Sequence, residues 1–374
     1  MKAKITLFVL IASLVGGSYW YYDANRYTMP KTIEVTPWAK GKVQQQLATL
    51  TKPITVLDVK KAYGYLSAHS ANKNIIYFAI RNGKATVHIP EKNVKKTTQF
   101  KVMNYVVTKL AQQKRLTNND FLVVLSDKPD SIALPPEVAH VPLFVFAKDM
   151  ASKPSTIQLL IVDSFTLKFW CEMYKTLEKG LKSHPWEKKE NKLFWRGKTT
   201  DSVDITEIRL NSPRVSLVKL TKQFPDRYDA RLTKILSTDA AQITQVKELC
   251  GEPVPFASIR EHLPYKYQIT LDGVTATFPG YIWRMGSGCV NIKQDSKNEQ
   301  WFYDLFKPNV HYLTVARDLS NLDTVLIGAK THDIEMKEMA MRTRHVVEQE
   351  LTPSKVFGYL VELLNGYATK VNTL

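Results

Sequence analysis

Cysteine is scarce in this sequence, and so are patterns of metal ligands. Three cysteines, Cys171, Cys250 and Cys289, occur in 374 residues, and they form neither a CxxC pair nor a spaced ligand set. A disulfide framework is therefore not expected. The sequence also has no cluster of histidines and no Asp-x-Asp pair, so we expect no bound metal.

Internal repeats, low-complexity tracts and N-glycosylation acceptors are missing as well. No Asn-x-Ser/Thr triplet with a permitted middle residue occurs, which together with the few cysteines favours a bacterial protein. The composition of 44% hydrophobic and 23% charged residues is that of a globular protein, which excludes a disordered or fibrous chain. The length of 374 residues suits two domains.

Acidic residues are outnumbered by basic ones. The chain has 52 Lys and Arg against 35 Asp and Glu, for a formal net charge of +17. This excess favours anionic partners such as nucleotide diphosphates, acidic glycans or an anionic membrane surface. A solvated basic surface is the alternative, because the lysines are scattered along the chain. No recognisable nucleic-acid-binding element accompanies the charge, so nucleic acid is not an expected partner.

The N-terminal residues predict attachment to a membrane. Lys2 and Lys4 precede an apolar run that continues to Tyr22 and ends in aromatic residues. A run of this length can cross a bilayer, with the lysines in the cytoplasm and the aromatic residues at the far interface. A cleaved signal peptide is the alternative, since Gly16 and Ser18 suit a cleavage site. We therefore expect a single-pass protein, most naturally of a bacterial inner membrane.

The rest of the chain alternates short apolar runs with helical patterns, which is typical of parallel sheets with crossover helices. The pattern predicts three strands at residues 121–125, 143–146 and 159–162, and three more at residues 267–271, 289–292 and 312–315. A helix is expected over residues 100–116, and a Lys-rich linker over 182–192. A last helix should be capped by Ser354 and ended by Gly366.

The predicted fold class is α/β, with two Rossmann-like domains that face a cleft. We expect an anchor or signal peptide at residues 1–22, an acceptor-side domain at 23–180 and a nucleotide-sugar-binding domain at 181–374, with terminal helices that cross back. In such folds, ligands bind at the carboxyl ends of the parallel strands.

A series of short motifs lies in one order along residues 120–325. They include Val123-Val124-Leu125-Ser126-Asp127, Phe194-Trp195-Arg196-Gly197-Lys198, His262-Leu263-Pro264-Tyr265-Lys266-Tyr267, Leu271-Asp272-Gly273, Lys293-Gln294-Asp295-Ser296 and Trp301-Phe302-Tyr303. Their order and spacing resemble glycosyltransferase family 90, which contains capsule-associated proteins and protein O-glucosyltransferases. The resemblance implies a GT-B fold, an inverting transfer from a UDP-sugar, and no cofactor.

Asp127 is the candidate catalytic base. It follows a buried apolar strand, where partial desolvation would raise the pKa of its carboxyl group. The residues alone also allow a turn or helix cap, because Lys128 and Pro129 follow. The family's catalytic aspartate falls at this position, so the resemblance favours the base. Asp163 is the second candidate.

The candidate donor site combines cations with a Gly-containing turn. Arg196, Gly197, Lys198 and Arg214 lie in or just after that turn, where backbone amides and cations can meet a diphosphate, although a solvent-facing basic loop is the alternative. The resemblance adds the donor-wrapping stretch Val274, Thr275, Ala276, Thr277 and Phe278, with Lys266 and Asp272 as further candidates.

Two residues depart from the family pattern. Pro279 stands where relatives place an Arg on the diphosphate, and Gln300 stands where they usually have Glu. Proline can neither neutralise a phosphate nor donate from its backbone. We expect Arg284 to compensate, provided that a helix begins near Pro279 and turns Arg284 toward the cleft.

The sequence therefore predicts a membrane-tethered glycosyltransferase. The resemblance makes glucose or xylose the expected sugar, and a hydroxyl of a glycan, lipopolysaccharide or capsule the expected acceptor. A protein hydroxyl is an alternative acceptor. A catalytically inactive glycan-binding or assembly protein with the same fold is the alternative function, because of Pro279 and Gln300. The side of the membrane on which the catalytic part lies stays open.

Overall fold

The computed structural model describes residues 27–69, 74–91, 94–95, 97–126, 129, 132–200 and 210–372. The predicted anchor at residues 1–22 and Asp127 both lie outside these ranges. Among the described residues, no helix is both long and apolar enough to cross a membrane.

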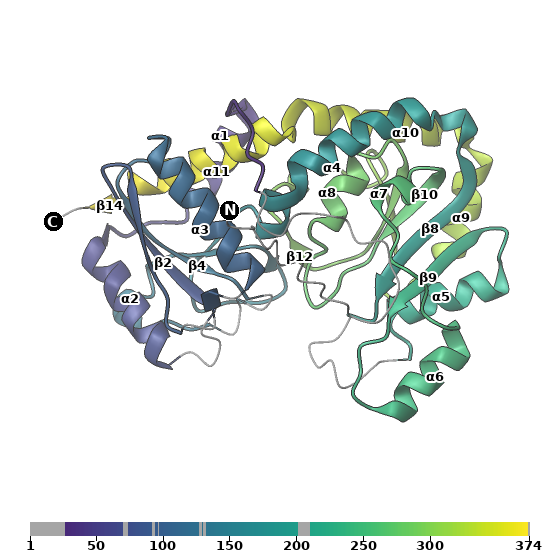
Figure 1. Ribbon diagram of the computed structural model, residues 1–374, viewed down its shortest axis with the longest axis horizontal. Coiled ribbons are helices and arrows are strands. Elements are labelled where there is room, and N and C mark those ends of the chain that lie inside the picture. The colour runs from purple at the N-terminus through teal and green to yellow at the C-terminus, as the bar shows by residue number, and fades with distance from the viewer. Residues whose placement is uncertain are drawn as a thin grey trace, which may run out of the picture.

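Two five-stranded sheets lie side by side, each with helices packed against it (Figure 1). The strand order of the first sheet is β3-β2-β4-β5-β7 and that of the second is β13-β11-β10-β8-β9. The first comprises β2 (Ile75–Arg81), β3 (Lys84–His88), β4 (Asn119–Val124), β5 (Leu143–Val145) and β7 (Gln158–Leu160). The second comprises β8 (Glu190–Lys198), β9 (Tyr228–Lys234), β10 (Tyr265–Thr270), β11 (Val290–Gln294) and β13 (Leu313–Val315).

The helices fill the connections. They are α1 (Pro37–Leu47), α2 (Val56–His69), α3 (Thr98–Gln112), α4 (Ser164–Ser183), α5 (Pro213–Gln223), α6 (Ala240–Cys250), α7 (Ile259–His262), α8 (Gly280–Met285), α9 (Leu322–Thr331), α10 (Asp333–Glu350) and α11 (Pro353–Ala368). Local sequence sets several starts. Thr97 caps α3 through the Phe100 amide, and Ser212 caps α5 with Pro213 directly after it.

The second sheet is parallel throughout, as predicted, but the first is mixed. Strands β4, β5 and β7 run parallel, whereas β2 pairs antiparallel with both β3 and β4. The reason is the Asn82-Gly83 turn between β2 and β3, in which both residues have positive φ, 49° and 79°. Such a two-residue turn can join only antiparallel neighbours, and the sequence reading overlooked it.

The expected turn around Gly197 is instead part of strand β8, which continues to Lys198. A Cβ atom on Gly197 would lie 2.3 Å from the Trp195 indole, so glycine lets that ring fold back over the strand. The Arg196-Gly197 segment therefore offers the pocket a strand end and no loop of free amides.

The last helix also differs from its prediction. Helix α11 begins at Pro353 after an N-cap at Thr352, and it continues past Gly366 to Ala368. A Cβ atom on Gly366 would lie 2.8 Å from the Leu47 side chain, so this glycine allows close packing of α1 instead of ending the helix.

The two sheets have separate cores that the C-terminal helix and a short ladder connect. Helix α11 packs on the first sheet, where Tyr367 meets Phe144 edge-on and the Asn119 amide donates to the Leu364 carbonyl. A two-stranded ladder pairs β6 (Lys148–Asp149) with β12 (Asn298–Glu299), supported by an ion pair between Lys297 and Asp149. A second ladder joins β1 (Ile54–Thr55) to β14 (Val371–Asn372).

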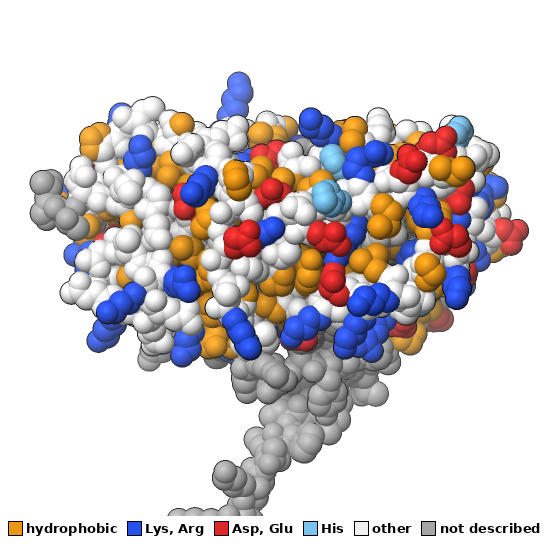
Figure 2. Space-filling view, turned by 90° about the horizontal axis from the view of Figure 1, so that it is seen from above, with side chains coloured by type: hydrophobic (Ala, Val, Ile, Leu, Met, Phe, Trp, Pro, Cys, Tyr) orange, Lys and Arg blue, Asp and Glu red, His pale blue; other side chains and the backbone are white. Residues whose placement is uncertain are grey.

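Positive and negative side chains are mixed on the face that contains α10 and α11. Figure 2 shows lysine and arginine side chains across this face, with acidic side chains among them. The net charge of +17 is therefore not gathered there into one basic patch.

Candidate functional site

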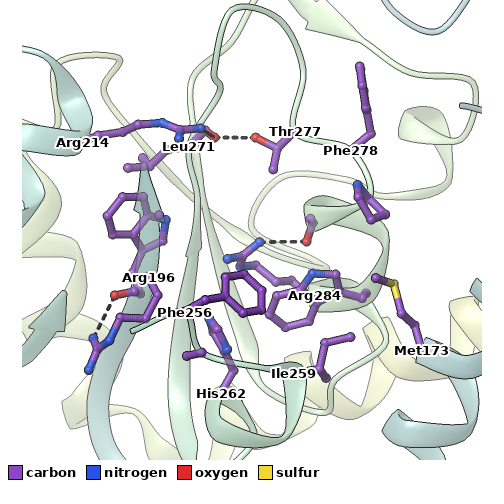
Figure 3. A pocket seen from close by; sticks show the side chains of 16 residues that line it. Met173, Arg196, Arg214, Phe256, Ile259, His262, Leu271, Thr277, Phe278 and Arg284 are labelled. Atoms are coloured by element: carbon purple, nitrogen blue, oxygen red, sulfur yellow. Dashed lines mark hydrogen bonds between the residues drawn. The ribbon is translucent and has the colours of Figure 1, made fainter. Parts of the chain in front are cut away.

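A pocket of about 260 Å³ lies at the carboxyl ends of β8 and β10 (Figure 3). Side chains from α4, α5, α7 and α8 close its sides, and most of the lining is apolar. This is the end of a parallel sheet at which such folds bind ligands. Among the predicted donor residues, the lining includes Arg196, Gly197, Arg214, Thr277, Phe278 and Arg284.

The Arg214 guanidinium is held by protein oxygen atoms. Its Nε donates to the Asp272 carbonyl at 3.1 Å, and its Nη2 donates to the Leu271 carbonyl at 3.2 Å. Its Nη1 donates to the Lys198 carbonyl at 2.8 Å and to Thr200 Oγ1 at 2.7 Å. These bonds join the end of β8 to the end of β10. Arg214 therefore shapes the rim of the pocket and contributes positive potential to it.

Arg196 and Lys198 differ from Arg214 in their surroundings. The Arg196 guanidinium forms an ion pair with Asp229 at 2.8 Å and lies over the Phe194 ring, so a neighbouring carboxylate already balances its charge. Lys198 is exposed at the end of β8, and it does not line the pocket.

Arg284 is a buried cation without an acidic partner among the described residues. A helix does begin after Pro279, as the sequence suggested, and Arg284 on that helix α8 extends into the centre of the pocket (Figure 3). Its side chain is 6% exposed, and Nη1 donates to the Gly280 carbonyl at 2.9 Å. Within the described ranges, no carboxylate pairs with it and its Nε has no partner. Burial and then the charge of Arg214 lower the pKa of Arg284 to about 9, which leaves it protonated at neutral pH.

The stretch after β10 forms one wall. Thr277 Oγ1 donates to the Leu271 carbonyl, and the Gly273 amide donates to the Thr275 carbonyl at 2.9 Å. The Asp272 carboxylate accepts from Ser296 and from Asn298, so it holds this wall in place from behind. Val274, Thr275 and Ala276 belong to the same loop without lining the pocket.

His262 also lines this pocket, although it was not among the residues predicted to bind the donor. Its Nδ1 lies 2.8 Å from the Ser258 carbonyl, and its ring packs edge-on against Phe194 and Trp283. Burial, then the charge of Arg284, lowers the pKa of His262 to about 3. The ring is therefore neutral at physiological pH. Its place in the motif before β10 was visible in the sequence, but its burial beside Arg284 was not.

The remaining candidates lie away from the pocket. Asp163 is fully buried as the N-cap of α4, where it accepts from the Thr166 amide at 2.8 Å and from the Thr166 hydroxyl at 2.5 Å. Burial raises the pKa of Asp163 to about 6. Lys266 lies at the opposite end of β10, where it pairs with Asp333 at 2.5 Å over the Trp186 ring. Asp127 follows β4 in the chain and cannot be placed among the described residues.

No group of three or more His, Cys, Asp or Glu side chains in the described part of the chain is arranged to hold a metal ion.

Comparison with known proteins gives a family. The sequence model of glycosyl transferase family 90 matches residues 64–373. Protein O-glucosyltransferase 2 of Danio rerio is 32% identical over 183 residues, which is 49% of this chain and 33% of that protein. Human protein O-glucosyltransferase 3 is 24% identical over 300 residues, or 79% of this chain and 55% of that protein.

Two further comparisons complete these findings. Human protein O-glucosyltransferase 1 is 26% identical over 204 residues, or 53% of this chain and 47% of that protein. The crystal structure of Anabaena Alr3699/HepE in complex with UDP-glucose is 10% identical, covers 72% of this chain and 82% of its own, and has a TM-score of 0.42. The chain thus spans between a third and just over half of the length of these curated relatives.

Proposed function

Because this chain belongs to glycosyl transferase family 90, we propose that it is a glycosyltransferase that moves a sugar from a UDP-sugar to an acceptor hydroxyl. The two sheets would then be the two halves of a GT-B fold, with the pocket beside β8 and β10 as the donor site. One observation carries the proposal most strongly. Arg284 is a buried guanidinium in this pocket, and it lacks a carboxylate partner among the described residues.

An unbalanced buried cation is costly, so the pocket favours an anion. A nucleoside diphosphate fits because it brings two adjacent phosphates and gains negative charge as it leaves the sugar. Arg284 would meet that charge directly, in the place that Pro279 leaves without an arginine. Arg214 would act mainly by holding the ends of β8 and β10 around the phosphates, because hydrogen bonds to four protein oxygens hold its guanidinium. No metal is needed in this scheme.

Asp127 remains our candidate base. In the proposed reaction its carboxylate takes the proton from the acceptor hydroxyl as the oxygen attacks the anomeric carbon, and UDP leaves from the opposite face. The configuration at the anomeric carbon is then inverted. The competing carboxylate, Asp163, has no exposed surface and is occupied by the first turn of α4, which supports Asp127 by contrast.

The sugar and the acceptor are the finer part of the proposal. The names of the relatives favour glucose as the sugar, with xylose as the alternative. The same names favour a protein hydroxyl as acceptor, whereas the N-terminal residues Lys2 to Tyr22 favour a glycan or lipopolysaccharide acceptor at a bacterial inner membrane. We keep the membrane anchor and the inner-membrane location as parts of this proposal.

A catalytically inactive glycan-binding protein is the second candidate, and Pro279 and Gln300 motivate it. Gln300 is 1% exposed, and its amide donates to the Thr277 carbonyl at 3.2 Å and to the Tyr303 hydroxyl at 3.0 Å. It therefore supports the donor wall from behind, a role that a neutral amide can fill. Pro279 stands at the start of α8, the helix that carries Arg284.

A panel of radiolabelled sugar nucleotides separates the two candidates. The purified protein is incubated with each donor in the presence of a chelator, and the released sugar is counted. A glycosyltransferase should slowly hydrolyse one UDP-sugar in preference to the other donors, even without an acceptor. Binding of UDP without release of sugar, with any of the offered acceptors, would favour the inactive protein. Failure to bind any nucleotide would refute both.

A further inference from the structure

The lining of the donor pocket includes an exposed aromatic side chain. Phe256 lines the pocket and is 47% exposed, whereas no other phenylalanine or tryptophan in the described part of the chain is exposed. A phenyl ring in water leaves apolar surface uncovered, and covering that surface is favourable. A ligand that packs against Phe256 therefore gains binding free energy.

The backbone that carries Phe256 is anchored on both sides. The prolines before and after Val254 favour an extended chain, and the Val254 amide donates to the Leu232 carbonyl of β9 at 2.9 Å. Two residues after Phe256, the Ser258 amide donates to the Glu261 carboxylate at 2.6 Å, at the start of α7. The ring is thus presented from a fixed segment, so a ligand that covers it orders little further structure.

The pocket has a charged centre and an apolar end. Figure 3 shows Phe256 and Ile259 on the side of the Arg284 guanidinium opposite to Leu271 and Thr277. A nucleoside diphosphate has the same order of parts, with anionic phosphates joined through a ribose to a flat base. The base can stack on an aromatic ring, because both have exposed π faces.

The contacts of the pocket with the first sheet set the direction of the ligand. Phe278, in the wall opposite Phe256, meets Phe146 and Phe165 at ring centroid distances of 6.2 and 6.4 Å. Phe146 directly follows β5 of the first sheet. The proposed function places the acceptor and its base on the first sheet, so the reacting sugar must lie between the diphosphate and that sheet. The nucleoside, at the other end of the diphosphate, then extends toward Phe256.

We propose that Phe256 is the stacking platform for the nucleobase of the donor. The inference rests on the proposed function, because it assigns the other end of the same donor to a residue of the same pocket. Stacking uses a π face that every base has, so Phe256 secures the base without selecting one base over another. Phe256 is therefore a binding residue and has no part in the chemical step.

The test compares the binding of UDP with that of inorganic pyrophosphate, which has the charge but no base, by calorimetric titration. The proteins are the wild type, Phe256→Ala, Phe256→Tyr and Tyr65→Ala, a control that removes an exposed ring of α2 outside the pocket lining. Phe256→Ala should raise the dissociation constant for UDP by about 5- to 100-fold and leave that for pyrophosphate within about 2-fold. Phe256→Tyr, which keeps the ring, and Tyr65→Ala should both bind UDP within about 2-fold of the wild type.

The outcomes separate this inference from the proposed function. Unchanged UDP affinity in Phe256→Ala would overturn the stacking role and leave the glycosyltransferase proposal standing. An equal loss for UDP and pyrophosphate would also overturn it, because the ring would then act on the charged centre and not on the base. A Phe256→Tyr protein that binds UDP as weakly as Phe256→Ala would overturn it as well. A wild type that binds neither UDP nor pyrophosphate would overturn both this inference and the proposed function.

Discussion

The two arginines of the pocket should respond to substitution in opposite ways when stability is measured, and in the same way when UDP binding is measured. Arg284→Met removes a buried charge that no described carboxylate balances and that the charge of Arg214 repels. Replacing an unfavourable buried charge with an apolar side chain should raise the unfolding free energy by about 1 kcal/mol or more. Arg214→Met instead leaves the carbonyls of Lys198, Leu271 and Asp272 without their donor, so it should lower the melting temperature.

The expected loss of UDP affinity follows from the hydrogen bonds at stake. A charge-assisted hydrogen bond contributes about 1.5 to 3 kcal/mol, so Arg284→Met should raise the dissociation constant for UDP by about 10- to 150-fold. Arg214→Met should also weaken binding, because the ends of β8 and β10 lose their connection. Since both arginines act on one diphosphate, the double variant should lose less binding free energy than the two single variants lose in sum.

Calorimetric titration of UDP gives the affinities, and thermal unfolding monitored by circular dichroism gives the stabilities. Arg344→Met is a useful contrast, because that arginine is also buried but is paired with Glu178 and Glu348. The Arg344→Met substitution should therefore lower the melting temperature of the protein. An Arg284→Met protein that melts at a lower temperature and binds UDP normally would show that Arg284 is structural, and would refute the reasoning.

Three further outcomes are expected. Asp127→Asn should lower turnover by roughly 100-fold or more with little change in UDP affinity, and retention of more than about a third of the activity would make Asp127 structural. Asp163→Asn should leave turnover near that of the wild type, and a loss as large as that of Asp127→Asn would move the base to Asp163. The pKa of His262 is lower in the folded chain than in the unfolded chain, so the stability that its neutral ring contributes is complete above about pH 6.5 and is lost as the pH falls. Denaturant titrations should show that the unfolding free energy of the wild type falls by about 2 kcal/mol relative to that of His262→Phe between pH 7 and 5. Parallel pH dependences of the two proteins would contradict this.

Some of the fold could be predicted because buried strands have a recognisable sequence pattern. β4, β5 and β7, and likewise β10, β11 and β13, lie within a few residues of their predicted positions, since each is an apolar run bounded by turn residues. The hairpin β2–β3 was missed although its Asn82-Gly83 turn was readable. The end of α11 was misplaced because Gly366 serves a contact with α1, which no local pattern reveals.

Several residues that line the pocket could be named from the sequence, but their contacts could not. Arg196, Arg214 and Arg284 all line the pocket, yet their sequence positions do not tell which is already paired. Arg196 meets Asp229 on the neighbouring strand, and Arg214 meets carbonyls from two strands that are distant in the chain. Only the assembled sheet shows that, among the described residues, no carboxylate pairs with Arg284.

The most direct measurement is a crystal structure of the protein with UDP bound. The account predicts a diphosphate within about 3 Å of the Arg284 guanidinium, at the carboxyl ends of β8 and β10. A nucleotide bound at another place, or a diphosphate that contacts neither Arg284 nor the loop after β10, would contradict the assignment of this pocket as the donor site.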